Sequence, residues 1–183
     1  IFSMIPNGWA LQLSNGTAVR YAQLFPSMQV SRSDCNRGVS GIDGCTSTAI
    51  GASSVLKTTT LLVSGDMSAM YDMGAFAAPC ITPQFKMVVL CNNGGEIFRF
   101  IESTRSLPQL DKCFAVSDRK YPVEKIAETF GFKIFLASSH EELKQEFLNM
   151  CAENNQPAML CVYTDGDTSA DALRNYLSLK LDC

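Results

Sequence analysis

Two short apolar runs, each followed by polar and glycine residues, constrain the fold of this chain more than any other feature. Thr60–Val63 comes just before Gly65-Asp66, and Met87–Leu90 comes just before Cys91-Asn92-Asn93-Gly94-Gly95. Both runs have the length and β-branched content of buried strands. In open parallel sheets, ligands bind in the loops at the carboxyl ends of strands. The stretch 65–98 therefore predicts two binding loops at one edge of a sheet.

Strands and helices are expected to alternate along the whole chain. Apolar runs bounded by turn residues predict strands at 9–13, 28–30, 60–63, 86–90, 132–136 and 157–163. Helices are expected at 17–25, 45–55, 68–77, 122–130, 139–153 and 168–179. Pro122 suits a first helical turn, and Ser139 and Thr168 are expected N-caps. The pattern predicts one α/β domain over residues 1–183, doubly wound, with a mainly parallel sheet of about six strands and helices on both faces.

The composition excludes some classes of protein. The 183 residues are 46% hydrophobic, which is enough for a full core. The net charge is −3 and Lys and Arg form no cluster, so we expect no nucleic-acid or anionic-membrane partner. No apolar run approaches the roughly 18–20 residues of a transmembrane helix.

The N-terminus and the cysteines indicate whether the chain is part of a longer protein and whether its thiols are reduced. The chain begins at Ile1 without an initiator Met or signal-peptide features, so we expect a piece of a longer protein. Its eight cysteines include no C-x-x-C pair and are expected to be reduced thiols of a cytoplasmic protein. A zinc site is disfavoured, because the only histidine, His140, has no cysteine at ligand spacing.

Asp66 and Asn92 are the candidate metal ligands. They lie 92 − 66 = 26 residues apart, which is one helical crossover, so both are expected at the same edge of the sheet. A carboxylate, an amide oxygen and a backbone carbonyl would supply half of the octahedron that Mg²⁺ prefers, and a diphosphate could complete most of the rest. Gly94-Gly95 would let the backbone approach a phosphate closely. The alternative is that Asp66 caps a helix and the glycine pair forms a turn.

The stretch 31–44 is a polar, glycine-rich loop that is long for a compact domain. Arg37 offers a forked donor to a carboxylate or phosphate, and Ile42 could press an apolar face on a ring. A flexible, solvated loop is the alternative.

These motifs resemble those of the thiamine-diphosphate-dependent decarboxylases and synthases. Gly-Asp followed some 25 residues later by Asn at a strand end is similar to the cofactor motif of that superfamily. The resemblance implies Mg²⁺ (or Mn²⁺) ligands at Asp66, Asn92 and the carbonyl of Gly94. The chain departs from the pattern at Met67, where Gly is usual, and at Cys91, where Asn is usual. A second register would use Asn93 and Gly95.

Over residues 9–101 the resemblance is closer to one family, the MenD synthases of menaquinone biosynthesis. It rests on the stretches 14–20, 36–44, 65–72 and 92–98. It implies that Arg20 and Arg37 bind substrate, and that Gly16 contacts the diphosphate in place of the family's Ser. It implies the following cofactor-binding residues: Gly16, Ile42, Gly65, Asp66, Met67, Ser68, Asn92, Gly94, Gly95, Glu96 and Ile97. For Glu96, a solvated carboxylate is the alternative.

The resemblance implies the C-terminal, diphosphate-binding domain of a transferase. That enzyme decarboxylates 2-oxoglutarate on thiamine diphosphate and adds the resulting carbanion equivalent to isochorismate, working as a homo-oligomer (dimer or tetramer). The glutamate that activates the cofactor comes from another domain in this superfamily. We therefore expect no catalytic residue in this chain and no activity from it alone.

Two rival interpretations remain open from the sequence. One is an acetolactate-synthase-like or 2-oxoacid decarboxylase domain, which would lack the loop of Arg37. The other is a catalytically empty α/β domain that binds a nucleotide or only a protein partner.

Overall fold

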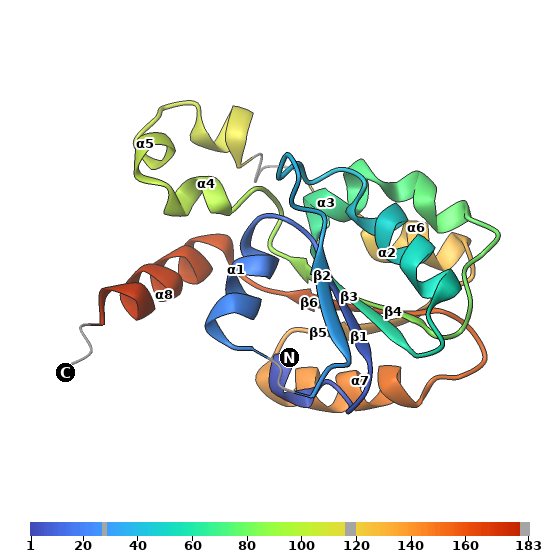
Figure 1. Cartoon of the computed structure of the whole chain (residues 1–183). Coiled ribbons are helices and arrows are strands. Elements are labelled where there is room, and N and C mark those ends of the chain that lie inside the picture. Colours follow the sequence, from blue (N-terminus) through green and yellow to red (C-terminus); the bar gives the residue numbers. More distant parts are fainter. Residues whose placement is uncertain (27–28, 116–119, 180–183) are drawn as a thin grey trace.

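A computed structural model describes residues 1–26, 29–115 and 120–179 of the chain. Six strands pair in parallel in the order β2-β1-β3-β4-β6-β5 (Figure 1). The strands are β1 Ala10–Leu13, β2 Arg32–Cys35, β3 Thr60–Gly65, β4 Phe85–Cys91, β5 Lys133–Ala137 and β6 Ala158–Tyr163. This arrangement confirms the predicted doubly wound, parallel α/β fold.

Helices cover both faces of the sheet. The longer ones are α1 Thr17–Leu24, α2 Cys45–Val55, α3 Asp66–Tyr71, α6 Val123–Thr129, α7 His140–Ala152 and α8 Gly166–Ser178. The shorter ones are η1 Phe2–Met4, η2 Met73–Ala77, α4 Ile97–Phe100, α5 Glu102–Arg105 and a single π-helical turn, η3 Leu110–Phe114. Buried side chains of α1 and α7 pack on one face of the sheet, and those of α2, α3 and α6 pack on the other (Figure 1).

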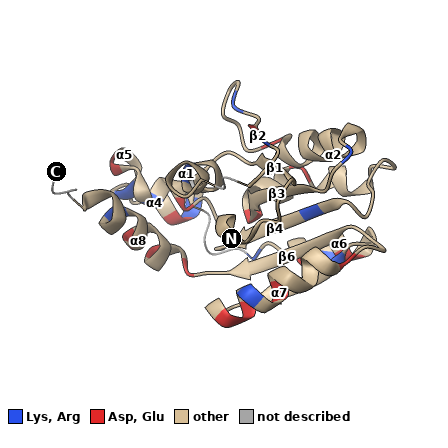
Figure 2. Cartoon of the chain, turned by 60° about the horizontal axis from the view of Figure 1, so that its bottom comes forward, with Lys and Arg blue, Asp and Glu red and all other residues tan. Residues whose placement is uncertain are grey.

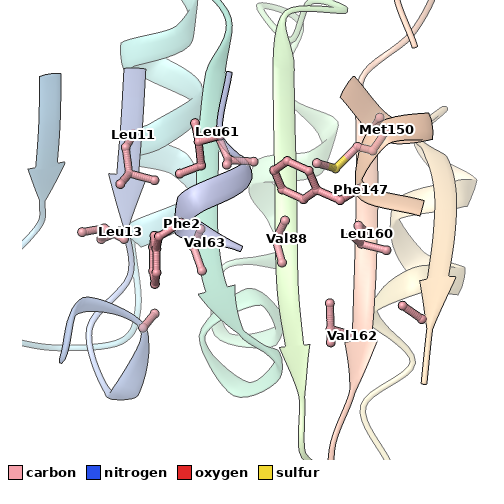
Figure 3. Close-up of a cluster of buried hydrophobic side chains, with 14 of the residues drawn as sticks. Phe2, Leu11, Leu13, Leu61, Val63, Val88, Phe147, Met150, Leu160 and Val162 are labelled. Atoms are coloured by element: carbon pink, nitrogen blue, oxygen red, sulfur yellow. The ribbon is translucent and has the colours of Figure 1, made fainter. Parts of the chain in front are cut away.

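The central strands are buried on both faces, which explains their continuous apolar runs. In β3, Leu61 and Val63 point into the core beneath α1 and α7, whereas Leu62 points into the opposite core. Figure 3 shows the first of these cores, with Phe147 of α7 packed above Val88 of β4. Successive side chains of a strand therefore meet two different helical layers.

The order of the strands creates a crevice between β1 and β3. The connection through α1 crosses one face to reach β2, and the connection through α2 returns across the other face to β3. Loops that leave neighbouring strands toward opposite faces open a crevice at the carboxyl ends of those strands. The fold therefore provides a binding position between the loops after β1 and β3.

One predicted strand was wrong. The expected strand at 28–30 is not formed at residues 29–30, and residue 28 lies outside the described residues; β2 is instead Arg32–Cys35, inside the stretch predicted to be a loop. This strand is an edge strand that pairs with β1 alone among the described residues, and its polar side chains are largely solvent-facing. An edge strand needs no apolar run, so the hydrophobic pattern did not reveal it.

Most helix boundaries agree with the prediction to within a few residues, with two corrections. The single helix expected at 68–77 is two helices, because α3 ends at Tyr71 and a separate 3₁₀ helix follows Asp72. The last helix is capped by Asp165, whose side chain accepts a hydrogen bond from Thr168 N, rather than by Thr168. Ser139 caps α7 as predicted.

Charged residues of both signs are mixed along the outer helices. Figure 2 shows Lys and Arg beside Asp and Glu on α7 and in the region of α4 and α8. In the part of the chain that the structure describes, we find no helix with the length and apolarity needed to span a bilayer.

We expect the Phe147→Ala variant to lose about 3–5 kcal/mol of unfolding free energy, because the ring is fully buried and its removal leaves a cavity beneath α7. Leu148→Ala is the matched control, since the neighbouring side chain is 60% exposed and should cost less than about 1 kcal/mol. Urea denaturation measures both. Equal losses for the two variants would contradict the packing described here.

Candidate functional site

The loops after β1, β2, β3 and β4 surround a cavity of about 440 Å³. Every site residue suggested by the sequence lines it: Gly16, Arg20, Arg37, Ile42, Gly65, Asp66, Met67, Ser68, Asn92, Gly94, Gly95, Glu96 and Ile97. The structure thus brings together residues from four separate stretches of the chain. The role of each of these residues is still a prediction.

Asp66 is a buried carboxylate at the carboxyl end of β3. It is 1% exposed, and its two oxygens accept hydrogen bonds from the backbone N–H groups of Met67 and Asn93, both at 2.7 Å. Burial raises the pKa of Asp66 to about 6, and these backbone donors oppose the rise. No Lys or Arg forms an ion pair with it among the described residues. A bound cation would offset the cost of burying this charge.

The loop after β4 presents Asn92 and Gly94 to the cavity and turns Asn93 away from it. Asn92 and Gly94 line the cavity, while Asn93 is exposed and does not. Asn93 has φ +61°, and Gly94 has φ +156°. This turn directs the backbone N–H of Asn93 to Asp66, leaving its side chain outside. The geometry favours the register of Asn92 and Gly94 over that of Asn93 and Gly95.

The two registers predict different effects of two substitutions. We expect Asn92→Ala to weaken Mg²⁺-dependent binding of thiamine diphosphate about tenfold or more, because a metal ligand is lost. Asn93→Gly should leave that affinity within about threefold, since glycine tolerates the positive φ and the backbone donor to Asp66 is retained. Calorimetric titration of both variants decides between the registers, and the reverse order of affinities would establish the second one.

Asn15, after β1, is a residue that sequence reasoning missed. Its side chain is 4% exposed and donates to the carbonyls of Asn36 and Gly41, both at 2.6 Å. Its amide oxygen accepts a hydrogen bond from Arg37 at 3.2 Å. One buried amide therefore holds both ends of the loop that carries Arg37. Its sequence signals were its place in a turn between a strand and a helix and its position in the stretch 14–20 that resembles the family, but no role was assigned to it.

The same loop is anchored on its other side by α3. The hydroxyl of Ser68 donates to the carbonyl of Ile42 at 2.6 Å. Asp72, just after α3, accepts hydrogen bonds from the backbone N–H and the hydroxyl of Ser47, in the first turn of α2. The C-terminal end of the loop predicted to be functional is therefore attached to α3, next to Asp66.

Arg20 and Arg37 reach the cavity from α1 and from the loop after β2. Both residues are exposed overall, although each lines the cavity. Neither forms an ion pair with a carboxylate in residues 1–26, 29–115 and 120–179. Two guanidinium groups without carboxylate partners are suited to anionic ligands.

Glu96 is buried rather than solvated, which removes the alternative considered from the sequence. It is 5% exposed, and one carboxylate oxygen lies 2.7 Å from Nε of Arg99. Arg99 also pairs with Asp111 at 2.6 Å and with Asp167 at 3.0 Å. Burial raises the pKa of Glu96, and Arg99 counteracts that rise.

The donor set fits a hard cation better than a transition metal. No three His, Cys, Asp or Glu side chains converge as a metal site among the described residues. The set formed by Asp66, Asn92 and the backbone of Gly94 contains a single carboxylate and otherwise neutral oxygens. Mg²⁺ is commonly held by one or two carboxylates together with phosphate oxygens and water. The residues therefore suit a metal ion that arrives with a phosphorylated ligand.

Comparison with known proteins finds relatives that all carry the name of one synthase. No family model matches the chain. A Porphyromonas gingivalis protein named 2-succinyl-5-enolpyruvyl-6-hydroxy-3-cyclohexene-1-carboxylate synthase is 38% identical over 179 residues, which cover 97% of this chain. Proteins of the same name from Christiangramia forsetii and Flavobacterium johnsoniae are 32% and 33% identical, over 97% and 96% of the chain. The chain is homologous to part of these synthases.

The chain spans about a third of the synthases' length, since the matches cover 31%, 31% and 32% of the three relatives. The similarity to the synthases also reaches further along this chain than the motifs did. The motifs lie within residues 9–101, whereas the matches include most of the remaining residues. The resemblance seen in the sequence is therefore confirmed, and it extends over the elements α6 to α8.

Proposed function

We propose that this chain is the C-terminal, diphosphate-binding domain of a thiamine-diphosphate-dependent synthase of menaquinone biosynthesis. The proposed enzyme is a transferase that decarboxylates 2-oxoglutarate and joins the remaining fragment to isochorismate. The observation that carries the proposal is the cavity between the strand ends, where buried Asp66, Asn92 and two exposed arginines meet. The related synthase from Porphyromonas gingivalis is named for the product of this reaction, which supports the proposal.

Each part of the cavity has a proposed role. Asp66, Asn92 and the carbonyl of Gly94 would hold Mg²⁺ (or Mn²⁺), and the backbone at Gly94-Gly95 would approach the cofactor diphosphate. Ile42 would pack against the cofactor ring, held by Ser68. Bound thiamine diphosphate supplies the electron sink for decarboxylation and carbon–carbon bond formation.

Arg20 and Arg37 would bind the carboxylates of the two substrates. Arginine suits this role because its planar fork matches a carboxylate in a bidentate geometry. Asn15 would orient Arg37 through their 3.2 Å hydrogen bond. In this proposal, the residues of this chain bind and orient the substrates and the cofactor. The glutamate that activates the cofactor is expected in another domain of a homo-oligomeric, cytoplasmic enzyme.

A turnover assay with the full-length protein tests the proposal. We expect product from 2-oxoglutarate and isochorismate only when thiamine diphosphate and Mg²⁺ are present, and none from this chain alone. Product from pyruvate but not from 2-oxoglutarate would favour an acetolactate-synthase-like or decarboxylase domain instead. Synthesis by the isolated chain would contradict the expectation that the activating glutamate lies elsewhere.

A further inference from the structure

The carboxyl group of Glu96 lies directly against the first residue of α8. A Cβ atom added to Gly166 would overlap with the carboxyl carbon and both oxygens of Glu96. Gly166 is buried and begins the helix just after its capping residue, Asp165. The helix N-terminus is a favourable environment for a carboxylate. Any other residue at position 166 would require the end of the Glu96 side chain to shift.

The contact is part of a wider connection between α8 and the loop after β4. Arg99 of α4 pairs with Glu96 at 2.7 Å and with Asp167 of α8 at 3.0 Å. Arg174 of α8 donates to the carbonyl of Arg99 at 2.9 Å. Helices α4 and α8 pack together, as Figure 1 shows. The start of α8 therefore touches a cavity residue although no residue of α8 lines the main cavity itself.

Glu96 is well placed to transmit this contact to the proposed metal loop. It follows Gly94 by two residues, lines the main cavity, and also lines a smaller cavity of about 110 Å³ bounded by α1 and α8. The pair with Arg99 on one side and the packing on Gly166 on the other hold its carboxylate in position. Because Arg99 and Gly166 hold the carboxylate between them, we expect its displacement to shift the backbone that leads from Gly94.

We propose that Gly166 is a positioning residue of the cofactor site: by leaving space for the Glu96 carboxylate, it sets the loop 92–96 in its ligand-binding conformation. This inference rests on the proposed function, because it assumes that the loop binds the metal and the diphosphate. It makes the start of α8 a determinant of cofactor affinity.

A double-mutant cycle in the full-length protein tests the inference. Calorimetric titration with thiamine diphosphate and Mg²⁺ should show binding about tenfold weaker for Gly166→Ala than for wild type, since small displacements in a binding site are costly. Glu96→Ala should itself weaken binding. Adding Gly166→Ala to Glu96→Ala should cause less than about a twofold further change, because the obstructing carboxylate is gone. Gly51→Ala is the matched control, as a Cβ there meets nothing within 4 Å.

Each outcome bears on the inference. An affinity of Gly166→Ala within twofold of wild type would overturn it, as would an equal loss in the presence and absence of Glu96. If wild type binds no thiamine diphosphate, the proposed function fails, and the midpoint of urea unfolding then tests the contact alone. A midpoint lowered by Gly166→Ala only when Glu96 is present supports the contact, and one lowered equally in both backgrounds overturns it.

Discussion

The Asp66→Asn variant of the full-length protein is expected to bind thiamine diphosphate at least about 100-fold more weakly than wild type in the presence of Mg²⁺. Asparagine keeps the size of the side chain but removes the only carboxylate in the proposed ligand set. In the wild type, the two carboxylate oxygens accept hydrogen bonds from the backbone N–H groups of Met67 and Asn93. Asparagine has only one oxygen to accept, so its N–H₂ group would face the other backbone donor. Calorimetric titration with saturating Mg²⁺ measures the change.

Asp171→Asn provides the control for this substitution, because its carboxylate is 62% exposed and pairs only with Arg174 among the described residues. Its affinity for the cofactor should equal that of wild type. Unchanged, Mg²⁺-dependent binding by the Asp66 variant would contradict the proposed metal site. That outcome would support the rival view of an α/β domain without this cofactor.

Asn15→Asp should reduce kcat/KM of the full-length enzyme by about 100-fold and lower its unfolding free energy by about 2–4 kcal/mol. The change replaces the amide N–H₂ by an oxygen, which would face the carbonyls of Asn36 and Gly41 at the present 2.6 Å. Three oxygen atoms cannot remain this close without a proton between them, so both ends of the loop would move. Arg37 would then lose its orientation toward the cavity.

Steady-state kinetics and urea denaturation measure this effect, and Asn175→Asp is the matched control. Asn175 is exposed on α8, so the same chemical change there should leave both quantities close to wild type. Wild-type kinetics for the Asn15 variant would show that the loop does not depend on this amide for its position.

The fold was largely predictable because the chain alternates clear apolar runs with capped helices. β3 and β4 are buried on both faces, so each contains a continuous apolar run, Leu61–Val63 in β3 and Met87–Leu90 in β4. β2 was missed because an edge strand such as Arg32–Cys35 can be polar. The helix predicted at 68–77 is divided at Asp72, whose carboxylate accepts hydrogen bonds from Ser47. This contact joins residues 25 positions apart, so the local sequence did not reveal it.

The site residues at the ends of strands were predictable from their residue types. The residues whose roles depend on contacts with distant parts of the chain were not. Asp66 and Asn92 follow strands, so topology alone brings them together. The roles of Asn15 and Gly166 depend on partners 21 to 26 and 70 positions away, which no local pattern reports. The burial of Glu96 likewise follows from α8 and Arg99, elements that meet it only in the folded chain.

The most direct test of this account is a titration of the wild-type, full-length protein with thiamine diphosphate and, separately, with thiamine. We predict saturable binding of thiamine diphosphate that requires Mg²⁺ and disappears when EDTA is added, and no comparable binding of thiamine, which has no diphosphate for the metal to hold. Equal affinity for the two compounds, or binding of thiamine diphosphate that persists without a divalent cation, would contradict a metal-held diphosphate between Asp66 and Asn92.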